Sequence, residues 1–248
     1  MPAAARVRVV RHRLELFGDL ERPLVVAFMS DLHVGPTTSP ATLDAAFDAL
    51  HTVPIDVLLL GGDYVFLDLS PELATDLSRR IERVPARLKL GVLGNHDLWT
   101  DTSVIEHALS RAGVRVLVND ASPLPEPFSD VAVLGLDDPW TGAPDAERAL
   151  LRAGSARHRL GLAHSPDGAA FLERPKVSML FSGHTHGGQI ALPGERPLWL
   201  PPGPYSRRYP AGLHRSDGLW LFVSRGVGAT DLPIRMYAPP EVAIFEIH

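Results

Sequence analysis

The segment SGHTHGGQ, residues 182–189, contains the residues of this sequence with the clearest capacity for chemistry. Its two histidines, His184 and His186, stand two positions apart, so in an extended segment both imidazoles lie on one side of the backbone. Such a pair could bind one metal ion, but two unrelated surface histidines are the commoner outcome for an isolated pair. The metal interpretation therefore depends on further ligands elsewhere in the chain.

Further residues of the ligand type follow four other apolar runs of the sequence. Each stands where the carboxyl end of a strand would be, and ligands of open α/β sheets bind at that edge. We therefore predict that these residues converge on one rim together with His184 and His186. They are Asp31 and His33 after PLVVAFMS, Asp63 after DVLLLGG, Asn95, His96 and Asp97 after LKLGVLG, and His164 after LGLA.

Seven of these side chains suit two metal ions better than one. One tetrahedral zinc needs only four ligands, whereas two four-coordinate ions that share one bridging carboxylate need seven residues. Mixed His and carboxylate ligation favours Mn, Fe, Zn or Co over Mg or Ca alone. Neighbouring glycines permit the tight backbone paths that such convergence requires.

Each of these positions has a plain structural explanation when it is taken alone. Asp31 suits a turn or a helix cap, Asn95 is an ordinary turn former, and His164 suits a strand end bonded to backbone. The metal interpretation rests on recurrence at five strand ends. Asp137 and Asp138, after the run VAVLGL, could face the substrate or form a plain turn.

Alternating strand and helix patterns predict the scaffold that positions these residues. Ser39 is the expected N-cap of the first helix and Pro40 its first residue. The alternation implies a mostly parallel sheet, while fewer helices and more turns in the last third favour antiparallel pairing there. We predict an α/β fold in which residues 1–248 form one domain, with two sheets packed face to face and helices outside. The predicted strands are 23–31, 56–63, 88–97, 114–119, 131–138, 160–167, 177–186, 218–226 and 241–248, and the predicted helices are 39–50, 70–84 and 102–113.

Composition excludes several classes of protein. The 248 residues are 45% hydrophobic, which suits one α/β domain with a sizeable core. A net charge of -5 disfavours nucleic-acid binding, and the absence of cysteine excludes disulfides and thiolate metal sites. No apolar run approaches the ~20 residues of a membrane helix, and the first residues lack a signal-peptide core. We expect a cytoplasmic protein, with peripheral membrane contact as the alternative; nothing in the sequence indicates an oligomeric state.

The motifs DLH, GGD, GNHD, AHSPD and GHTHGGQ, in this order over residues 31–189, resemble the pattern of the calcineurin-like metallophosphoesterase superfamily. The segments LDDPWTG, SRGVG and LPIRMYAPPE further resemble its bacterial branch of small phosphodiesterases and UDP-diacylglucosamine hydrolases. The resemblance implies a four-layer αββα sandwich with a dinuclear metal centre at the sheet rim. It also implies the following roles: Asp31, His33 and His186 on one metal, Asn95, His164 and His184 on the other, Asp63 bridging the two, and His96 facing the substrate.

The activity implied by this resemblance is that of a metal-dependent phosphoesterase, and of a phosphodiesterase in particular. A hydroxide that bridges the metals would attack phosphorus in line. His96 is the predicted group that assists the leaving oxygen, and Asp97 could orient its imidazole. The alternatives are a pyrophosphatase acting on a nucleotide-sugar lipid and a non-catalytic metal-binding scaffold, the latter disfavoured by the complete ligand set. The expected partner is a small phosphorylated substrate, which the first alternative makes lipid-linked.

The segment QIALPGERPLWLPPGPYSRRYPAGLH, residues 189–214, follows the last predicted ligand. Its prolines and glycines predict a mainly loop structure. We predict a substrate-reading flap in which Arg207 and Arg208 bind an anionic group by bidentate bonds. Its aromatic residues would stack on a base or sugar, or Leu198, Trp199 and Leu200 would meet a lipid chain. The alternative is a surface loop whose apolar residues pack on the core.

Overall fold

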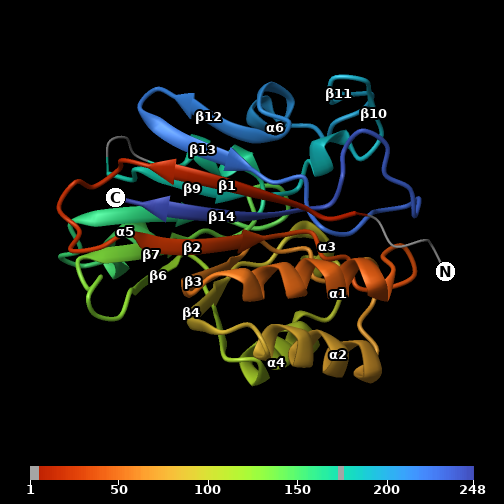
Figure 1. The fold of residues 1–248 in the computed structure, drawn as a ribbon, viewed down its shortest axis with the longest axis horizontal. Coiled ribbons are helices and arrows are strands. Elements are labelled where there is room, and N and C mark those ends of the chain that lie inside the picture. Colours follow the sequence, from red (N-terminus) through yellow and green to blue (C-terminus); the bar gives the residue numbers. More distant parts are fainter. Residues whose placement is uncertain (1–5, 173–175) are drawn as a thin grey trace.

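The structure is a computed structural model that describes residues 6–172 and 176–248. Within these residues, two six-stranded sheets stack face to face, and helices lie on both outer sides (Figure 1). The strand order is β1-β14-β2-β3-β4-β5 in the first sheet and β12-β13-β9-β8-β7-β6 in the second, beside a small hairpin of β10 and β11.

The first half of the chain builds most of the first sheet and the helices that cover it. Strands β2 to β5 are parallel, β14 is antiparallel to β2, and β1 pairs with β14 at the edge. The three predicted helices are confirmed. The elements are β1 (Arg8–Leu14), β2 (Leu24–Met29), α1 (Pro40–Ala49), η1 (Leu50–Thr52), β3 (Ile55–Leu60), α2 (Pro71–Glu82), β4 (Ala86–Gly91), α3 (Asn95–Leu98), α4 (Thr102–Arg111), β5 (Val114–Val116) and β14 (Glu241–Ile247).

Local capping explains where α1 and α2 begin. The Ser39 hydroxyl accepts the Thr42 amide at 3.1 Å, and the Ser70 hydroxyl accepts the Leu73 amide at 3.3 Å. A proline occupies the first helical position in both helices, where its missing amide costs no hydrogen bond.

The second half of the chain builds the second sheet. The expected antiparallel pairing is partly wrong: β12 pairs antiparallel with β13, but β8, β9 and β13 run parallel. The elements are β6 (Asp120–Pro123), β7 (Val131–Gly135), α5 (Ala146–Arg152), β8 (His158–Leu162), η2 (Pro166–Ala170), β9 (Met179–Ser182), η3 (His186–Gly188), β10 (Ala191–Leu192), β11 (Arg196–Pro197), α6 (Pro204–Arg208), β12 (Gly212–Ser216) and β13 (Leu219–Val223).

Three apolar layers hold the sheets and helices together. In β2, Phe28 packs between the sheets while Met29 packs under the helices, because successive strand residues face opposite sides. In β7, Val133 faces the first sheet and Leu134 faces the layer under α5. The order helix, sheet, sheet, helix follows, which confirms the expected four-layer αββα arrangement (Figure 1).

Two parts of the chain differ from the sequence-based expectations. Strand β1 was not predicted, because it is an edge strand whose side chains are mostly exposed and it lacks a buried apolar run. The segment 189–214 is less irregular than expected, since it contains β10, β11, α6 and the start of β12. Within residues 6–172 and 176–248, no helix combines the length and apolar character needed to cross a membrane.

Candidate metal centre and active-site cavity

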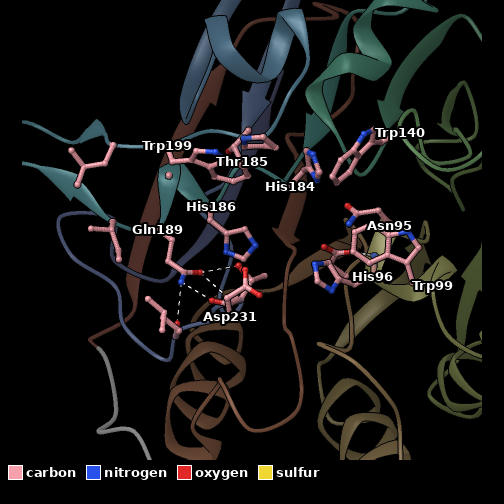
Figure 2. Close-up of a pocket in the computed structure, with 17 residues that line it drawn as sticks. Asn95, His96, Trp99, Trp140, His184, Thr185, His186, Gln189, Trp199 and Asp231 are labelled. Carbon is pink, nitrogen blue, oxygen red and sulfur yellow. Dashed lines mark hydrogen bonds between the residues drawn. The ribbon is translucent and has the colours of Figure 1, made fainter.

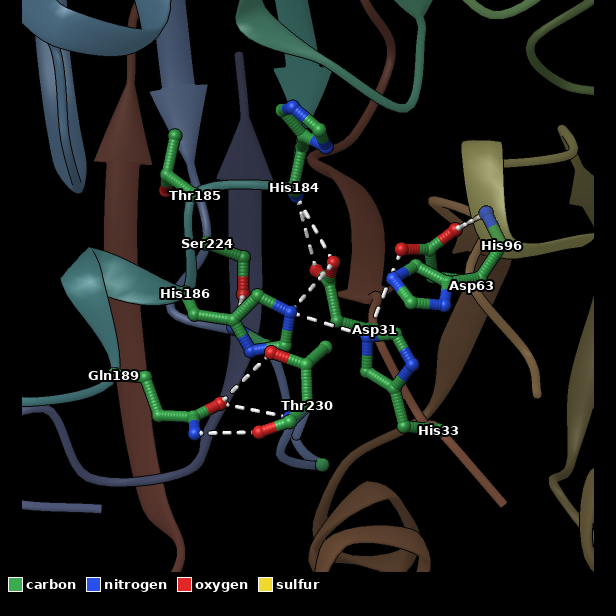
Figure 3. Close-up of polar contacts among 12 residues, drawn as sticks. Asp31, His33, Asp63, His96, His184, Thr185, His186, Gln189, Ser224 and Thr230 are labelled. Atoms are coloured by element: carbon green, nitrogen blue, oxygen red, sulfur yellow. Dashed lines mark hydrogen bonds and ion pairs between the residues drawn. The ribbon is translucent and has the colours of Figure 1, made fainter. Parts of the chain in front are cut away.

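The carboxyl ends of β2, β3, β4, β8 and β9 meet at one rim of the two stacked sheets, and the residues after them converge there (Figure 3). Ligand-type atoms in this region lie within 4.8 Å of one another in three groups. The convergence predicted from the sequence is therefore present in the structure. The three groups are Asp31, His33 and His186; His33, Asp63 and His96; and Asp31, Asp63 and His164.

Distances in the first part of this cluster fit a metal ion. His33 Nε2 lies 3.1 Å from His186 Nε2, and His186 Nε2 lies 3.4 Å from Asp31 Oδ1. His33 Nε2 also lies 3.6 Å from Asp63 Oδ2. Ligand atoms about 2.1 Å from a tetrahedral ion are separated by roughly 3.4 Å. The four side chains thus present nitrogen and oxygen atoms at the spacing of a coordination shell.

The second part of the cluster has the same character. His164 Nε2 lies 3.1 Å from Asn95 Oδ1, 3.2 Å from Asp63 Oδ2 and 3.2 Å from His184 Nδ1. Asp63 Oδ2 therefore borders both parts of the cluster. The donor set is oxygen and imidazole nitrogen throughout, which suits a divalent transition metal.

Backbone carbonyls fix how two of the histidines present their ring nitrogens. His33 Nδ1 lies 3.1 Å from the Val65 carbonyl, and His164 Nδ1 lies 2.8 Å from the Gly61 carbonyl. A carbonyl only accepts, so each Nδ1 carries the proton and each Nε2 lone pair faces the cluster. Such hydrogen bonds orient metal-binding histidines and raise their basicity.

Sequence reasoning missed Arg235, which lies behind His186. Its Nη2 lies 2.9 Å from His186 Nδ1, and the same guanidinium donates to the carbonyls of Gly228 and Ala238. Arg235 thereby ties the chain after β13 to the histidine. The only sequence signal was its place in LPIRMYAPPE, a segment that indicated the bacterial branch but no role for the arginine.

Asp97 does not orient His96, contrary to the expectation from the sequence. The buried Asp97 carboxylate accepts the amides of Asp63 at 2.8 Å, Tyr64 at 2.8 Å and Gly94 at 2.9 Å. The His96 imidazole is held instead through Nδ1, 2.7 Å from the carbonyl of Phe66. Asp97 thus holds together the two turns that carry Asp63 and His96.

Most of the predicted ligands occupy a backbone conformation that ordinary residues avoid. Positive φ angles outside glycine cost about 1–3 kcal/mol each and cluster at functional sites. These turns point several side chains at one centre, which neither a helix nor a regular strand would do. The ligands in this conformation are Asp31 (φ 52), His33 (φ 42), Asp63 (φ 53), His184 (φ 70) and His186 (φ 54).

Burial and mutual charge shift the pKa values of the clustered side chains in both directions. Burial lowers the pKa of His33 and of His184 to about 3, so both rings are neutral near pH 7. Burial raises the pKa of Asp31 to about 6. Burial opposes ionisation of Asp63, but the positive charge of His164 and its hydrogen bond to this carboxylate outweigh it and hold the pKa of Asp63 far below its usual range. Burial likewise opposes a charge on His164, but the Asp63 and Asp31 carboxylates outweigh it and raise the pKa of His164 well above its usual value. The cluster therefore offers neutral imidazoles at His33 and His184, and His164 would release its proton when a metal ion binds.

Gly94 lies against the Asp63 carboxylate. A Cβ at position 94 would lie 2.2 Å from Asp63 Oδ1 and 2.8 Å from His164 Cε1. Gly94→Ala is therefore expected to displace both side chains and to weaken metal binding about 10- to 100-fold, as measured by metal analysis after dialysis against a chelator. Gly161→Ala is the matched control, because its Cβ would meet only leucine and valine side chains at 3.1 to 3.4 Å. Unchanged metal retention in Gly94→Ala would contradict the role given to Asp63.

A cavity of about 470 Å³ opens above this cluster (Figure 2). Its lining includes four of the predicted metal ligands, Asp63, Asn95, His184 and His186. It also includes His96, so the predicted catalytic histidine faces the same space as these ligands. Most of the remaining lining is apolar or aromatic. The residues of this kind are Trp99, Trp140, Ile190, Leu198, Trp199, Pro201 and Leu232.

Arg207 and Arg208, predicted to bind substrate, are not among the residues that line this cavity. They lie on α6 with exposed side chains. Helix α6 is anchored through the buried Ser206, whose hydroxyl donates to Asp167 at 2.6 Å, and this turns the neighbouring arginines to solvent. Leu198 and Trp199, from the same predicted flap, do line the cavity. The predicted flap thus reaches the cavity through Leu198 and Trp199, while Arg207 and Arg208 lie outside its lining.

Residues 24–188 match the family model described as calcineurin-like phosphoesterase, and this span contains all the predicted metal ligands and His96. The chain belongs to the calcineurin-like phosphoesterase family and is a hydrolase that acts on phosphoric ester bonds. The resemblance stated from the motifs is confirmed.

Similar proteins agree with this family assignment. The chain is 33% identical over 247 residues to phosphodiesterase YaeI of Escherichia coli, an alignment that covers 96% of this chain and 87% of YaeI. It is 28% identical to the uncharacterized metallophosphoesterase YkoQ of Bacillus subtilis over 91% of this chain and 84% of that protein. The solved structure of Haemophilus influenzae NAD nucleotidase shares the fold, with a TM-score of 0.51 and 13% identity over 83% of this chain and 45% of that chain.

Proposed function

We propose that this protein is a phosphodiesterase whose active site holds two metal ions, with Asp63 as the bridging ligand. Asp31, His33 and His186 would complete one site, and Asn95, His164 and His184 would complete the other. The observation that carries the proposal is that Asp63 Oδ2 borders both parts of the ligand cluster, at 3.6 Å from His33 Nε2 and 3.2 Å from His164 Nε2. The 33% identity to a protein named as a phosphodiesterase agrees with it.

Metal ions bound at these residues would supply Lewis acidity, which activates a water for attack and neutralises charge on the phosphate oxygens. The protein's own part is to hold the ligands rigidly. The backbone turns at Asp31 and Asp63 and the carbonyls behind His33 and His164 fix each ligand before substrate arrives. Such preorganisation lowers the reorganisation cost of reaching the transition state.

His96 is suited to assist departure of the leaving oxygen. Its Nδ1 is fixed by the Phe66 carbonyl, so Nε2 is the nitrogen free to serve the cavity, and its backbone amide donates to Asp63 Oδ1 at 2.9 Å. This anchors the imidazole next to the predicted metal ligands. In the imidazolium form His96 would also hold a proton at Nε2, and that proton would pass to the oxygen that leaves phosphorus.

The charges around the cavity favour a diester over a pyrophosphate. Among the described residues that line it, none is lysine or arginine, so no side-chain cation awaits a second phosphate there. Asp231 at the rim adds a negative charge that would repel one. A phosphodiester carries a single negative charge, which the metal sites themselves would neutralise.

A substrate comparison on purified, metal-loaded protein tests this function. We expect kcat/KM for bis(p-nitrophenyl) phosphate to exceed that for p-nitrophenyl phosphate by about tenfold or more, because only the diester fills the cavity on both sides of phosphorus. A nucleotide-sugar pyrophosphate is the third substrate. A preference for the monoester or the pyrophosphate would overturn the assignment, and no hydrolysis of any of the three would favour a non-catalytic scaffold.

A further inference from the structure

Two tryptophans, Trp99 and Trp140, extend the cavity beyond the predicted metal ligands. The ring of Trp99 lies 4.8 Å from that of His96 and 5.8 Å from that of Trp140, which in turn lies 5.2 Å from the ring of His184. The four rings form a continuous row from the predicted catalytic histidine to a predicted metal ligand. Figure 2 shows both tryptophans beside His96, Asn95 and His184, on one side of the cavity.

The backbone under both tryptophans is fixed although the rings are open to solvent. The Trp99 amide donates to the Asn95 carbonyl at 3.1 Å. The turn at Trp140 is held by the fully buried Asp138, whose Oδ2 accepts the amides of Trp140 at 3.2 Å and Thr141 at 2.7 Å. The side chains of Trp99 and Trp140 are nevertheless 58% and 46% exposed. Large aromatic surfaces held in place but left uncovered are typical of binding sites.

A second group of apolar side chains lines the same cavity, and Figure 2 shows its Trp199 on the opposite side from Trp99 and Trp140. Leu198, Trp199 and Leu232 line the cavity and are 60%, 67% and 53% exposed. Gln189 clamps the loop that carries Leu232, since its amide nitrogen donates to the Thr230 carbonyl at 2.8 Å and its oxygen accepts the Thr230 amide at 2.8 Å. Two apolar walls therefore flank the predicted metal ligands, one for each ester group of a phosphodiester.

We propose that Trp99 and Trp140 form the subsite for the leaving ester group, and that they bind a planar ring of that group by stacking. The substrate class is then a phosphodiester with one negative charge and two uncharged, apolar ester groups, of which the leaving one bears the ring. The inference rests on the proposed function, because it takes His96 as the group that serves the leaving oxygen. Trp99 contacts His96 directly, so a leaving group within reach of His96 meets this wall first.

The opposite wall then receives the ester group that stays on phosphorus. Its aliphatic side chains and the open ring of Trp199 offer apolar contact without a defined ring slot, so this subsite accepts an alkyl or an aryl group. Transferring an apolar group from water to such a wall is favourable in proportion to the area covered.

Two substrates can distinguish the roles of the two apolar walls. Nitrophenyl methyl phosphate and nitrophenyl phenyl phosphate share the nitrophenyl leaving group and differ only in the retained ester. Trp99→Ala and Trp140→Ala are each expected to raise KM about 5- to 10-fold for both substrates, with kcat changed less than about threefold. Leu198→Ala with Leu232→Ala is expected to raise KM for the phenyl ester alone.

Matched variants decide between stacking and general apolar contact. Trp99→Phe keeps a ring and should retain a KM near that of the native protein, whereas Trp99→Leu keeps only apolar bulk and should behave like Trp99→Ala. Phe171→Ala, which removes an aromatic side chain that is 45% exposed and outside the cavity lining, should change neither KM. Metal content and the unfolding temperature of each variant confirm that the centre and fold are intact.

The outcomes distinguish this proposal from the proposed function. If the native protein hydrolyses both diesters but the tryptophan variants leave KM unchanged, the subsite is wrong and the phosphodiesterase assignment stands. If the tryptophan variants affect only the phenyl ester, the wall holds the retained group and the assignment of sides is wrong. If Trp99→Leu matches the native KM, the wall takes an alkyl chain instead of a ring. Failure of the native protein to hydrolyse either diester would overturn both proposals.

Discussion

Replacing Asp63 with asparagine is expected to lower kcat/KM by about 10³-fold or more and to reduce the content of both metal ions. Asp63 Oδ2 borders both parts of the ligand cluster, so loss of its charge affects the ligands of both parts. An amide keeps the shape of the carboxylate but removes its charge, and one of its two terminal atoms becomes a donor that cannot bind metal.

Elemental analysis of the reconstituted variant measures this effect directly, beside kinetics on bis(p-nitrophenyl) phosphate. Asp130→Asn is the matched control, because Asp130 forms only exposed ion pairs and should keep full metal content and activity. A fully loaded Asp63→Asn protein, or one that loses a single ion while the other stays tightly bound, would refute the shared-ligand arrangement.

Replacing His96 with alanine is expected to lower kcat about 10²- to 10⁴-fold on diesters with poor leaving groups. The effect on nitrophenyl esters should be far smaller, because nitrophenolate leaves without needing a proton. His96 lines the cavity while its Nδ1 is committed to the Phe66 carbonyl, so Nε2 is the nitrogen that would serve the leaving oxygen. Because the seven ligands proposed for the two metal ions do not include His96, metal content should be unchanged.

The comparison needs an alkyl diester and a nitrophenyl diester assayed with the same variant. His107→Ala, at an exposed position of α4, is the control for removing an imidazole. Equal losses on both substrates would mean that His96 binds the phosphate instead of protonating the leaving group. Loss of a metal ion from His96→Ala would mean that His96 supports the centre.

Much of the scaffold was predictable because local patterns determine it. Ser39 and Ser70 with the prolines that follow them mark where α1 and α2 begin, since capping depends only on the next few residues. Apolar runs such as VLLL in β3 become strands buried on both faces. Edge strand β1 and the hairpin of β10 and β11 were not predicted. Exposed edge strands lack the buried apolar run from which the other strands were predicted.

The candidate metal centre was predictable for a related reason. A residue that follows a parallel strand stands at the ligand-binding rim whatever its neighbours are. Asp31, Asp63, Asn95 and His164 could therefore be placed on the same rim without knowing the order of strands in either sheet. Ligand-type residues recur after several strands and again in the GHTH segment. This recurrence supported a metal site, which no single position could do.

Only the tertiary structure decided how side chains are used within that rim. The sequence marks Asp97 as a neighbour of His96, yet the fold turns Asp97 toward the amides of Asp63 and Gly94. It marks Arg207 as a cation near the site, yet the burial of Ser206 turns that arginine to solvent.

The same holds for contacts made between distant segments. Arg235 reaches His186 across 49 positions of sequence, and Trp99 meets Trp140 although no pattern links them. Composition and periodicity report whether a residue is buried and on which face of its own element it lies. Which groups then meet depends on strand order, crossovers and the left-handed turns at the strand ends, and these are determined by packing of the whole chain.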